Sequence, residues 1–296
     1  MSEVERTVGV IGVGRMGGAM ASVLADAGHE LCLWNRDRSK AEAVAAETGA
    51  DVAATPAEVA ARAGVIISSL ADDEAVLSVY SGDDGIVAGL GPGTVVVETS
   101  TIDPETVMKV GAMVDTTGAG FLDCPVSGSV ATVLSGSLIV MAGGDSRLVE
   151  EVTPVLAPLA ARVIHVGPRG SGAATKLAVN GLVHGLNVAL AEALVLAERA
   201  GVDRSTAYEV FASGAGGAPF VQYKRGAYEH PEEAPVAFSL DLVAKDLELI
   251  TALGDRVGAP LVQARAGLDI VRDAIEAGMG DSDMSAIAIH LRGASN

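Results

Sequence analysis

The sequence predicts an α/β protein, in which a doubly wound and largely parallel sheet is followed by an all-helical domain and a long helix joins the two. Through the first half, short runs of β-branched residues alternate with alanine-rich helical stretches, as they do where crossover helices connect parallel strands. Strand signals end at Gly167, and helical periodicity fills the rest of the chain. Single cores seldom extend beyond about 250–300 residues, so we expect two domains, 1–167 and 168–296.

The expected strands of the first half are short, apolar and bounded by turn residues. In chain order they are Thr7–Gly12, Glu30–Trp34, Gly64–Leu70, Thr94–Glu98, Phe121–Asp123, Leu138–Ala142 and Arg162–Val166. Parallel strands need long connections. Crossover helices are expected at Met16–Ala27, Ser39–Glu47, Ala57–Ala63, Glu74–Tyr80 and Pro104–Thr117. The final pair of strands is a candidate for antiparallel pairing.

The second half is predicted to be helical, with breaks at Gly, Pro and Asp residues. The expected helices are roughly Ser171–Ala200, Arg204–Ser213, Leu240–Val257, Leu261–Ala277 and Ser282–Leu291. Loops are expected at Gly214–Pro219 and Glu229–Pro235. The apolar stretch Ala173–Ala200 contains Lys, Asn and His residues, which a lipid-facing span tolerates poorly. A buried helix is therefore predicted, and no membrane span.

The charge balance and composition exclude several classes of function. Lys and Arg number 20 against 38 Asp and Glu, a net charge of −18, whereas nucleic-acid binders need a basic face. The chain has four Tyr, four Phe and one Trp, too few to suggest a stacking platform for single strands. Only two cysteines are present, and acidic residues precede the first apolar run. These features favour a reducing, cytoplasmic setting.

A glycine-rich segment, Gly12–Gly17, follows the first strand directly and opens the first helix. The spacing G-x-G-x-x-G is weak evidence alone, but this strand-turn-helix context is typical of a Rossmann-type dinucleotide site. Gly12 would make the tight turn, Gly14 would admit a pyrophosphate, and Gly17 would let the helix pack against the strand. The helix N-terminus would attract the phosphates. The alternative is an ordinary glycine-rich turn.

The end of the second strand indicates which cofactor is bound. NAD-specific sites usually place Asp or Glu there to hold the ribose 2′-hydroxyl, whereas this chain has Asn35 and Arg36. A guanidinium suits a 2′-phosphate, and Arg38 and Lys40 add positive charge, so NADP is favoured over NAD. Asp37 complicates this interpretation, and the alternative is a solvated loop that accepts either cofactor.

A polar turn, Ser127-Gly128-Ser129, follows a predicted strand end, where ligands of open α/β sheets generally bind. Hydroxyl and backbone N–H donors around a glycine could hold a small carboxylate. By spacing alone, a turn without function is the better interpretation.

A polar stripe runs along the long apolar helix. Lys176, Asn180, His184 and Asn187 return near the same helical angle, and buried polar groups must be paired or serve a purpose. The functional interpretation is that the Lys176 ammonium polarises a substrate carbonyl and supplies its proton, while Asn180 orients substrate or lysine. The alternative for Lys176 is a solvated surface residue, and His184 is expected to be a core or interface histidine.

Two further features favour structural interpretations by spacing alone. Asp241 and Lys245 stand four residues apart on a predicted helix and suit a surface ion pair. Cys124 has no nearby His in sequence and is expected to be a small buried residue. No spacing of His, Cys and Asp indicates a metal site.

Taken together, these segments resemble the β-hydroxyacid dehydrogenase family, which includes 3-hydroxyisobutyrate dehydrogenases and glyoxylate/succinic semialdehyde reductases. The resemblance covers nearly the whole chain. Five motifs in the family's order carry it: Gly9–Gly17, Ser100-Thr101, Asp123–Ser129, Gly172–Asn180 and Lys245–Leu247. It implies a small carbonyl or hydroxy acid substrate, and a homodimer or homotetramer in which the long helix packs against a second subunit.

The resemblance also implies roles for single residues. Lys176 would be the catalytic lysine, with Asn180 assisting it. The substrate-binding residues implied are Ser127, Gly128, Ser129 and Asp246. The cofactor-binding residues implied are Gly12, Gly14, Arg15, Met16, Gly17, Asn35, Arg36, Leu70, Ala71, Thr101 and Lys245. On this basis Lys245 reaches cofactor or substrate and is not merely part of a surface pair.

Within the family, Asn35-Arg36 and the Ser127–Ser129 turn resemble the NADPH-using glyoxylate/succinic semialdehyde reductases more than the isobutyrate enzymes. Imine reductases share the Asn-Arg pair but usually have Asp or Tyr where this chain has Lys176, which favours carbonyl chemistry. The apolar stretch Ala131–Ser135 suggests a substrate bulkier or less polar than glyoxylate. The expected function is NADPH-dependent reduction of small aldehyde or keto acids. The alternatives are 3-hydroxyisobutyrate oxidation, imine reduction, and a non-catalytic NADP-binding protein.

Overall fold

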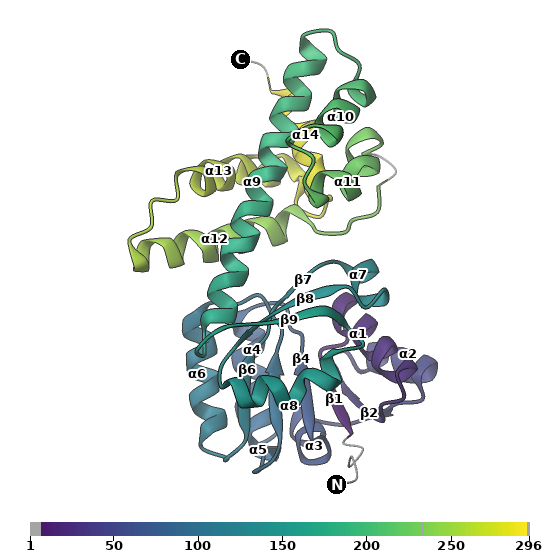
Figure 1. The fold of residues 1–296 in the computed structure, drawn as a ribbon, viewed down its shortest axis with the longest axis vertical. Coiled ribbons are helices and arrows are strands. Elements are labelled where there is room, and N and C mark those ends of the chain that lie inside the picture. The colour runs from purple at the N-terminus through teal and green to yellow at the C-terminus, as the bar shows by residue number, and fades with distance from the viewer. Residues whose placement is uncertain (1–6, 232–233, 295–296) are drawn as a thin grey trace. The chain divides into compact units, whose positions relative to one another are not determined.

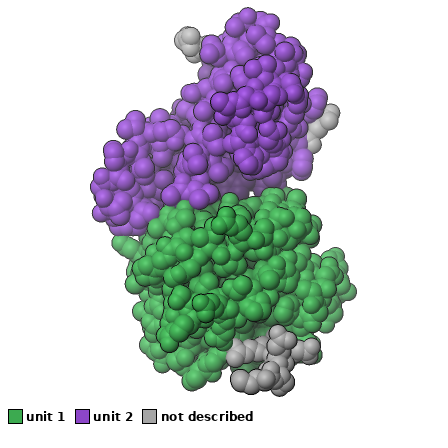
Figure 2. Space-filling model, viewed as in Figure 1, with its two compact units in different colours: residues 1–176 green, residues 177–296 purple. Residues whose placement is uncertain are grey.

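The computed structural model describes residues 7–231 and 234–294. The chain divides into two compact units, residues 1–176 and 177–296 (Figure 2). This division falls inside helix α9 (Ser171–Arg199), later than the expected boundary after Gly167. The difference arises because backbone groups at the start of α9 are hydrogen-bonded to the sheet of unit 1.

Unit 1 contains a nine-stranded sheet (Figure 1). The strands are β1 Val8–Ile11, β2 Leu31–Trp34, β3 Asp51–Val52, β4 Val65–Ser68, β5 Val95–Glu98, β6 Gly120–Asp123, β7 Val126–Ser127, β8 Leu138–Gly143 and β9 Ala160–Gly167. Their order is β3-β2-β1-β4-β5-β6-β8-β7, and β9 pairs with β8. Strands β1 to β6 pair in parallel, as predicted.

The predicted antiparallel pairing of the final two strands is wrong. Strand β8 is antiparallel to β6 and β7, but β9 runs parallel to β8. The reason is helix α8 (Ser146–Leu156), which supplies the crossover that a parallel pair requires. This helix was not predicted from the sequence, although Asp145 caps it by accepting from the N–H of Arg147.

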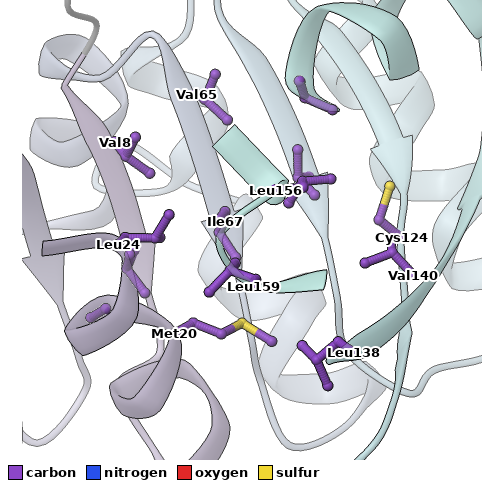
Figure 3. Packing of buried hydrophobic residues seen from close by; sticks show 14 of the residues in the cluster. Val8, Met20, Leu24, Val65, Ile67, Cys124, Leu138, Val140, Leu156 and Leu159 are labelled. Atoms are coloured by element: carbon purple, nitrogen blue, oxygen red, sulfur yellow. The ribbon is translucent and has the colours of Figure 1, made fainter. Parts of the chain in front are cut away.

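Helices cover both faces of this sheet. They are α1 Arg15–Asp26, α2 Arg38–Thr48, α3 Pro56–Arg62, α4 Asp73–Tyr80, α5 Ile86–Gly89, α6 Pro104–Asp115, α7 Val130–Leu134 and α8. Alternate side chains of one strand enter opposite cores: Val65 and Ile67 pack with α1 and α8 (Figure 3), and Ile66 packs with α3 and α6. Both faces of the central strands are therefore buried, which explains the apolar sequences of β1, β2, β4 and β5.

Unit 2 is helical. After α9 it contains α10 Arg204–Ser213, α11 Pro219–Glu229, α12 Leu240–Val257, α13 Val262–Ala274 and α14 Ile287–Gly293, with short π and 3₁₀ turns at Ile275–Met279 and Met284–Ala286. Helix α11 was not predicted, although Pro219 occupies its first turn. The predicted helix Ser282–Leu291 is instead the 3₁₀ turn followed by α14.

Of the helices that the structure describes, only α9 is long and apolar enough to cross a membrane, and 44% of its most apolar stretch is buried. Its polar residues Asn180, His184 and Asn187 are buried in unit 2. Asn187 donates to the Met284 carbonyl oxygen (3.0 Å) and accepts from the Tyr228 hydroxyl (2.7 Å). These three residues of the predicted stripe thus face the interior of unit 2, while Lys176 is half-buried.

A buried ion pair that sequence analysis missed joins α11 to the segments around α12 and α14. The Lys224 ammonium lies 2.7 and 2.8 Å from the two carboxylate oxygens of Asp283. Asp283 also accepts from the N–H groups of Ala237 and Phe238 and from both donors of Ser285. Both side chains of the pair are about 5% exposed. Asp283 therefore ties together three segments of unit 2.

Candidate active site

The three glycines of the first turn have different environments. Gly12 has φ +87°, and a Cβ there would collide with the Ser69 carbonyl oxygen, while a Cβ on Gly17 would collide with the Gly12 carbonyl oxygen. Gly14 is exposed, and a Cβ there would meet nothing within 4 Å. The fold itself therefore requires Gly12 and Gly17, whereas Gly14 leaves open space. Gly14 is also the N-cap of α1 and offers no side-chain acceptor to the first N–H groups, which suits a phosphate.

Asn35 connects the glycine turn to the end of β2. Its Oδ1 accepts from the Val13 N–H (3.1 Å), and its Nδ2 donates to the Asp37 carbonyl oxygen (2.9 Å). Because its amide is used in these bonds, Asn35 shapes the turn. The neighbouring Arg36 is exposed at the same place.

Asp37, which complicated the prediction of cofactor preference, caps helix α2. Its Oδ1 accepts from the Ser39 N–H (3.1 Å) and hydroxyl (2.7 Å). These hydrogen bonds, that of the hydroxyl above all, hold the pKa of Asp37 below its usual value. Arg38 is paired with Glu42 (2.7 Å). The Asp37 carboxylate is thus bound to the start of α2. Because Arg38 is paired with Glu42, Arg36 is the better candidate for a cofactor phosphate.

The segments after β4 and β5 are held together by a buried glutamate that sequence analysis missed. Glu98 is 1% exposed and accepts from the Tyr80 hydroxyl (2.9 Å) and the Ser100 N–H (2.7 Å). The Ser100 hydroxyl in turn accepts from the Leu70 N–H (2.8 Å). This chain of bonds joins Leu70 to Ser100, and it therefore runs beside the residues predicted to contact cofactor, which are Leu70, Ala71 and Thr101. The sequence signal that could have indicated this role is the position of Glu98, an acidic residue at the end of an apolar strand.

Burial raises the pKa of Glu98, although its hydrogen bonds oppose the rise. The ionised carboxylate is therefore disfavoured in the folded state, so stability should fall as pH rises from the unfolded pKa through the folded one. We expect the melting temperature of Glu98→Gln to rise relative to that of the unsubstituted protein as the pH rises above about 4.5, the ordinary pKa of a glutamate. Thermal melts from pH 4 to 7 measure this difference, with the exposed Glu105→Gln as control. A pH-independent difference would contradict it.

The turn Ser127–Ser129 lies between β7 and α7. Gly128 has φ +145°, and a Cβ there would press on Leu138 and Thr132. The Thr132 hydroxyl accepts from the Ser129 N–H (3.1 Å) and lies 3.3 Å from the Ser129 hydroxyl. Both Gly128 and Ser129 are exposed. The turn is therefore fixed internally and accessible from outside.

Unit 2 contains a second polar cluster, centred on Asp246 of α12. Its Oδ2 accepts from the Asn180 amide (2.6 Å) and lies 3.5 Å from Nε2 of His184, and its Oδ1 lies 3.1 Å from the Lys245 ammonium. Burial opposes ionisation of Asp246, but His184 and Lys245 outweigh it and lower the pKa of the carboxyl. Asp246 is fully buried, so it holds Asn180 and Lys245 in place from inside unit 2.

The remaining candidates for chemistry are buried. Cys32 and Cys124 are buried, unpaired thiols, and burial raises the pKa of both, which makes them poor nucleophiles. Within residues 7–231 and 234–294, no group of three His, Cys, Asp or Glu residues could hold a metal ion.

Two family models together match nearly the whole chain. Residues 7–167 match the NAD-binding domain of 6-phosphogluconate dehydrogenase, and residues 170–291 match the NAD-binding domain of NADP-dependent 3-hydroxyisobutyrate dehydrogenase. The chain belongs to the β-hydroxyacid dehydrogenase family. The predicted family, fold class and dinucleotide cofactor are thereby confirmed.

Relatives of this β-hydroxyacid dehydrogenase extend over nearly its full length. Glyoxylate/succinic semialdehyde reductase 1 of Arabidopsis thaliana is 35% identical, over 95% of this chain and 96% of that protein. 2-(Hydroxymethyl)glutarate dehydrogenase of Eubacterium barkeri is 31% identical over 95% and 93%. The solved structure of 3-hydroxyisobutyrate dehydrogenase from Mycobacterium tuberculosis matches with a TM-score of 0.87 at 30% identity, over 97% of this chain and 99% of that chain. The protein is thus an NAD(P)-dependent enzyme acting on small hydroxy acids or carbonyl compounds.

Proposed function

We propose that this enzyme reduces small aldehyde or keto acids with NADPH to the corresponding hydroxy acids. One observation supports this above all. Ile11, Ser68, Glu98 and Asp123, the last residues of β1, β4, β5 and β6, pair in register across the sheet. The segments that follow these residues include the glycine turn, Leu70-Ala71, Thr101 and the Ser127–Ser129 turn. Candidate cofactor and carboxylate contacts therefore follow one sheet edge, where ligands of such sheets bind.

In this proposal the bound NADPH supplies hydride to the carbonyl carbon. Lys176, in the second turn of α9, polarises the carbonyl oxygen and donates the proton. The Ser127–Ser129 turn holds the substrate carboxylate. Asn180 orients the reacting group, and Asp246 acts through Asn180 and Lys245 because it is itself enclosed. This assigns Asp246 a positioning role in place of the direct substrate contact expected from the sequence.

The test is NADPH oxidation with a panel of carbonyl compounds: glyoxylate, succinic semialdehyde, uncharged aldehydes of equal length and cyclic imines. We expect the acids to give the highest kcat/KM, because only they can use the Ser127–Ser129 turn, and we expect succinic semialdehyde to exceed glyoxylate. The reverse direction is assayed with 3-hydroxyisobutyrate and NADP⁺. Preference for imines, or for uncharged aldehydes over acids, would contradict the proposal.

Cofactor preference is proposed to depend on Arg36. A charge-assisted contact to the 2′-phosphate is worth about 1.5–3 kcal/mol, so Arg36→Ala should lower the ratio of kcat/KM for NADPH to that for NADH by about 10- to 100-fold. Arg38→Ala is the matched control, since that guanidinium is already paired with Glu42, and should change the ratio less than threefold. An unchanged ratio in Arg36→Ala would remove the 2′-phosphate role.

A dimer or tetramer is also proposed. Leu182 and Leu196 of α9 are 67% and 72% exposed, and they stand two heptads apart on the same helical side. Large exposed leucines on one helix face favour contact with a second subunit. Light scattering should give a mass of at least twice 29.7 kDa, reduced in Leu182→Glu/Leu196→Glu. A monomeric native protein would contradict this.

A further inference from the structure

The start of α9 is fixed by a buried carboxylate at the end of β6. Asp123 is 1% exposed, its Oδ1 accepts from the Gly170 N–H and its Oδ2 from the Ala173 N–H, both at 2.9 Å. Gly170 directly precedes α9, and Ala173 lies in its first turn, where N–H groups have no partner within the helix. The negative charge also suits the positive end of the helix dipole. Lys176 follows Ala173 by three residues on the same helix.

Close packing around this carboxylate depends on glycines. A Cβ on Gly143, the register partner of Asp123 in β8, would lie 2.5 Å from Asp123 Oδ1 and 2.7 Å from the Gly172 nitrogen. A Cβ on Gly172 would collide with the carbonyl oxygens of Asp123 and Met141. The helix start is therefore pressed against the ends of β6 and β8 with no room for a side chain.

A second contact restrains the chain just before the helix. The Arg169 guanidinium forms two hydrogen bonds with the carboxylate of Asp115 in α6 (2.8 and 2.7 Å) and lies over the Phe121 ring of β6 (5.4 Å). The helix start is thus held from two sides within unit 1. Asp123 also precedes Ser127 by only four residues. It therefore lies close in sequence to the Ser127–Ser129 turn and is hydrogen-bonded to the start of α9, the helix that carries Lys176.

We propose that Asp123 is a positioning residue, which sets the place of the Lys176 ammonium relative to the Ser127–Ser129 turn. The proposal rests on the proposed function of Lys176. Burial raises the pKa of Asp123 against the effect of its backbone hydrogen bonds, so desolvation of this carboxyl has a cost that the contacts with the helix start only partly offset. A purely structural helix cap at the surface, such as Asp145 of α8, has no such cost.

The experiment compares Asp123→Asn with Asp145→Asn, which alters a helix cap of the same unit far along the chain from Lys176. An amide keeps one acceptor oxygen and loses the charge, so the helix start should shift slightly without unfolding. Because small misplacement of a reacting group can cost about 100-fold, we expect kcat for succinic semialdehyde to fall 10- to 100-fold in Asp123→Asn, with the NADPH Kd within twofold. Asp145→Asn should retain kcat within twofold. A larger deuterium isotope effect from [4-²H]NADPH should accompany the loss.

A double mutant separates positioning from general destabilisation. If Asp123 acts through Lys176, Asp123→Asn should lower kcat less than twofold in a Lys176→Ala background, because coupled residues are not additive. Equal effects in both backgrounds, or a lower melting temperature with unchanged kcat, would overturn the inference. Gly143→Ala keeps the carboxylate, but its Cβ would press on both Asp123 Oδ1 and the Gly172 nitrogen. It provides a second variant if Asp123→Asn does not fold and should lower kcat likewise; unchanged kcat there would also overturn the inference.

The outcomes also distinguish this inference from the proposed function. An inactive Lys176→Ala with a fully active Asp123→Asn would overturn the role of Asp123 alone. A fully active Lys176→Ala would overturn the proposed function, and the inference with it.

Discussion

Replacing Lys176 by alanine is expected to lower kcat/KM for the best acid substrate by about 10²- to 10⁴-fold, the contribution of a positioned general acid. The NADPH Kd should stay within twofold, because the glycine turn, Asn35 and Arg36 lie on other segments of unit 1. The measurements are steady-state NADPH oxidation at 340 nm and a fluorescence titration of the cofactor.

Lys109→Ala is the control for this prediction. Lys109 is an exposed lysine of α6, so its removal changes the net charge equally and should leave turnover within twofold. Lys176→Arg adds a second comparison: it keeps the charge but donates protons poorly, so it should remain at least tenfold impaired. Full activity in Lys176→Ala would remove the lysine from the mechanism.

The largest loss of stability is expected from Asp283→Ala. The substitution leaves the buried Lys224 ammonium without its carboxylate and removes the acceptor for Ala237, Phe238 and Ser285. Breaking a buried pair from one side costs about 3–5 kcal/mol, measurable as a lower urea midpoint by circular dichroism. Asp255→Ala breaks the exposed pair with Arg265 and should cost under about 1 kcal/mol.

Two further measurements probe the same pair. Lys224→Met should cost less than Asp283→Ala, because the carboxylate keeps its other donors. Burial opposes the charge of Asp283, but the Lys224 ammonium and the Ser285 donors outweigh it and lower its pKa. The resulting stability is present above the unfolded pKa near 3.8 and should be lost as pH falls further. Equal costs for Asp283→Ala and Asp255→Ala would show that the cluster contributes nothing beyond a surface pair.

The sequence predicted the alternation of strands and helices well because both faces of the sheet are buried. The central strands β1, β2, β4 and β5 are then short apolar runs, as in Val95–Val97, and most breaks carry Gly, Pro or Asp. The missed elements have weaker patterns. Strand β7 has two residues and α7 has five, so neither shows a full period. Helix α8 does show a helical spacing of its buried Val149, Val152 and Leu156, but it contains Pro154, which disfavours a helix. The parallel direction of β9 could not be predicted without α8, because α8 is the crossover between β8 and β9.

The site was predictable where a motif combines with its chain context, as at Gly12–Gly17. What sequence could not supply are the partners of single polar side chains. Asp246 and Asn180 are 66 residues apart and Asp123 and Ala173 are 50 apart. No local spacing links such pairs, because the fold brings them together. The partner of Asn35 was equally unpredictable, because the hydrogen bond from the Val13 N–H to its side-chain oxygen spans 22 residues.

The double use of the Asn35 amide has a practical consequence for changing coenzyme preference by design. An acidic residue at position 35, as a search for an NADH-accepting catalyst would suggest, keeps an acceptor for the Val13 N–H but loses the amide donor to the Asp37 carbonyl oxygen. Such an exchange would deform the loop that both coenzymes share. Libraries should therefore vary position 36 and keep position 35 unchanged.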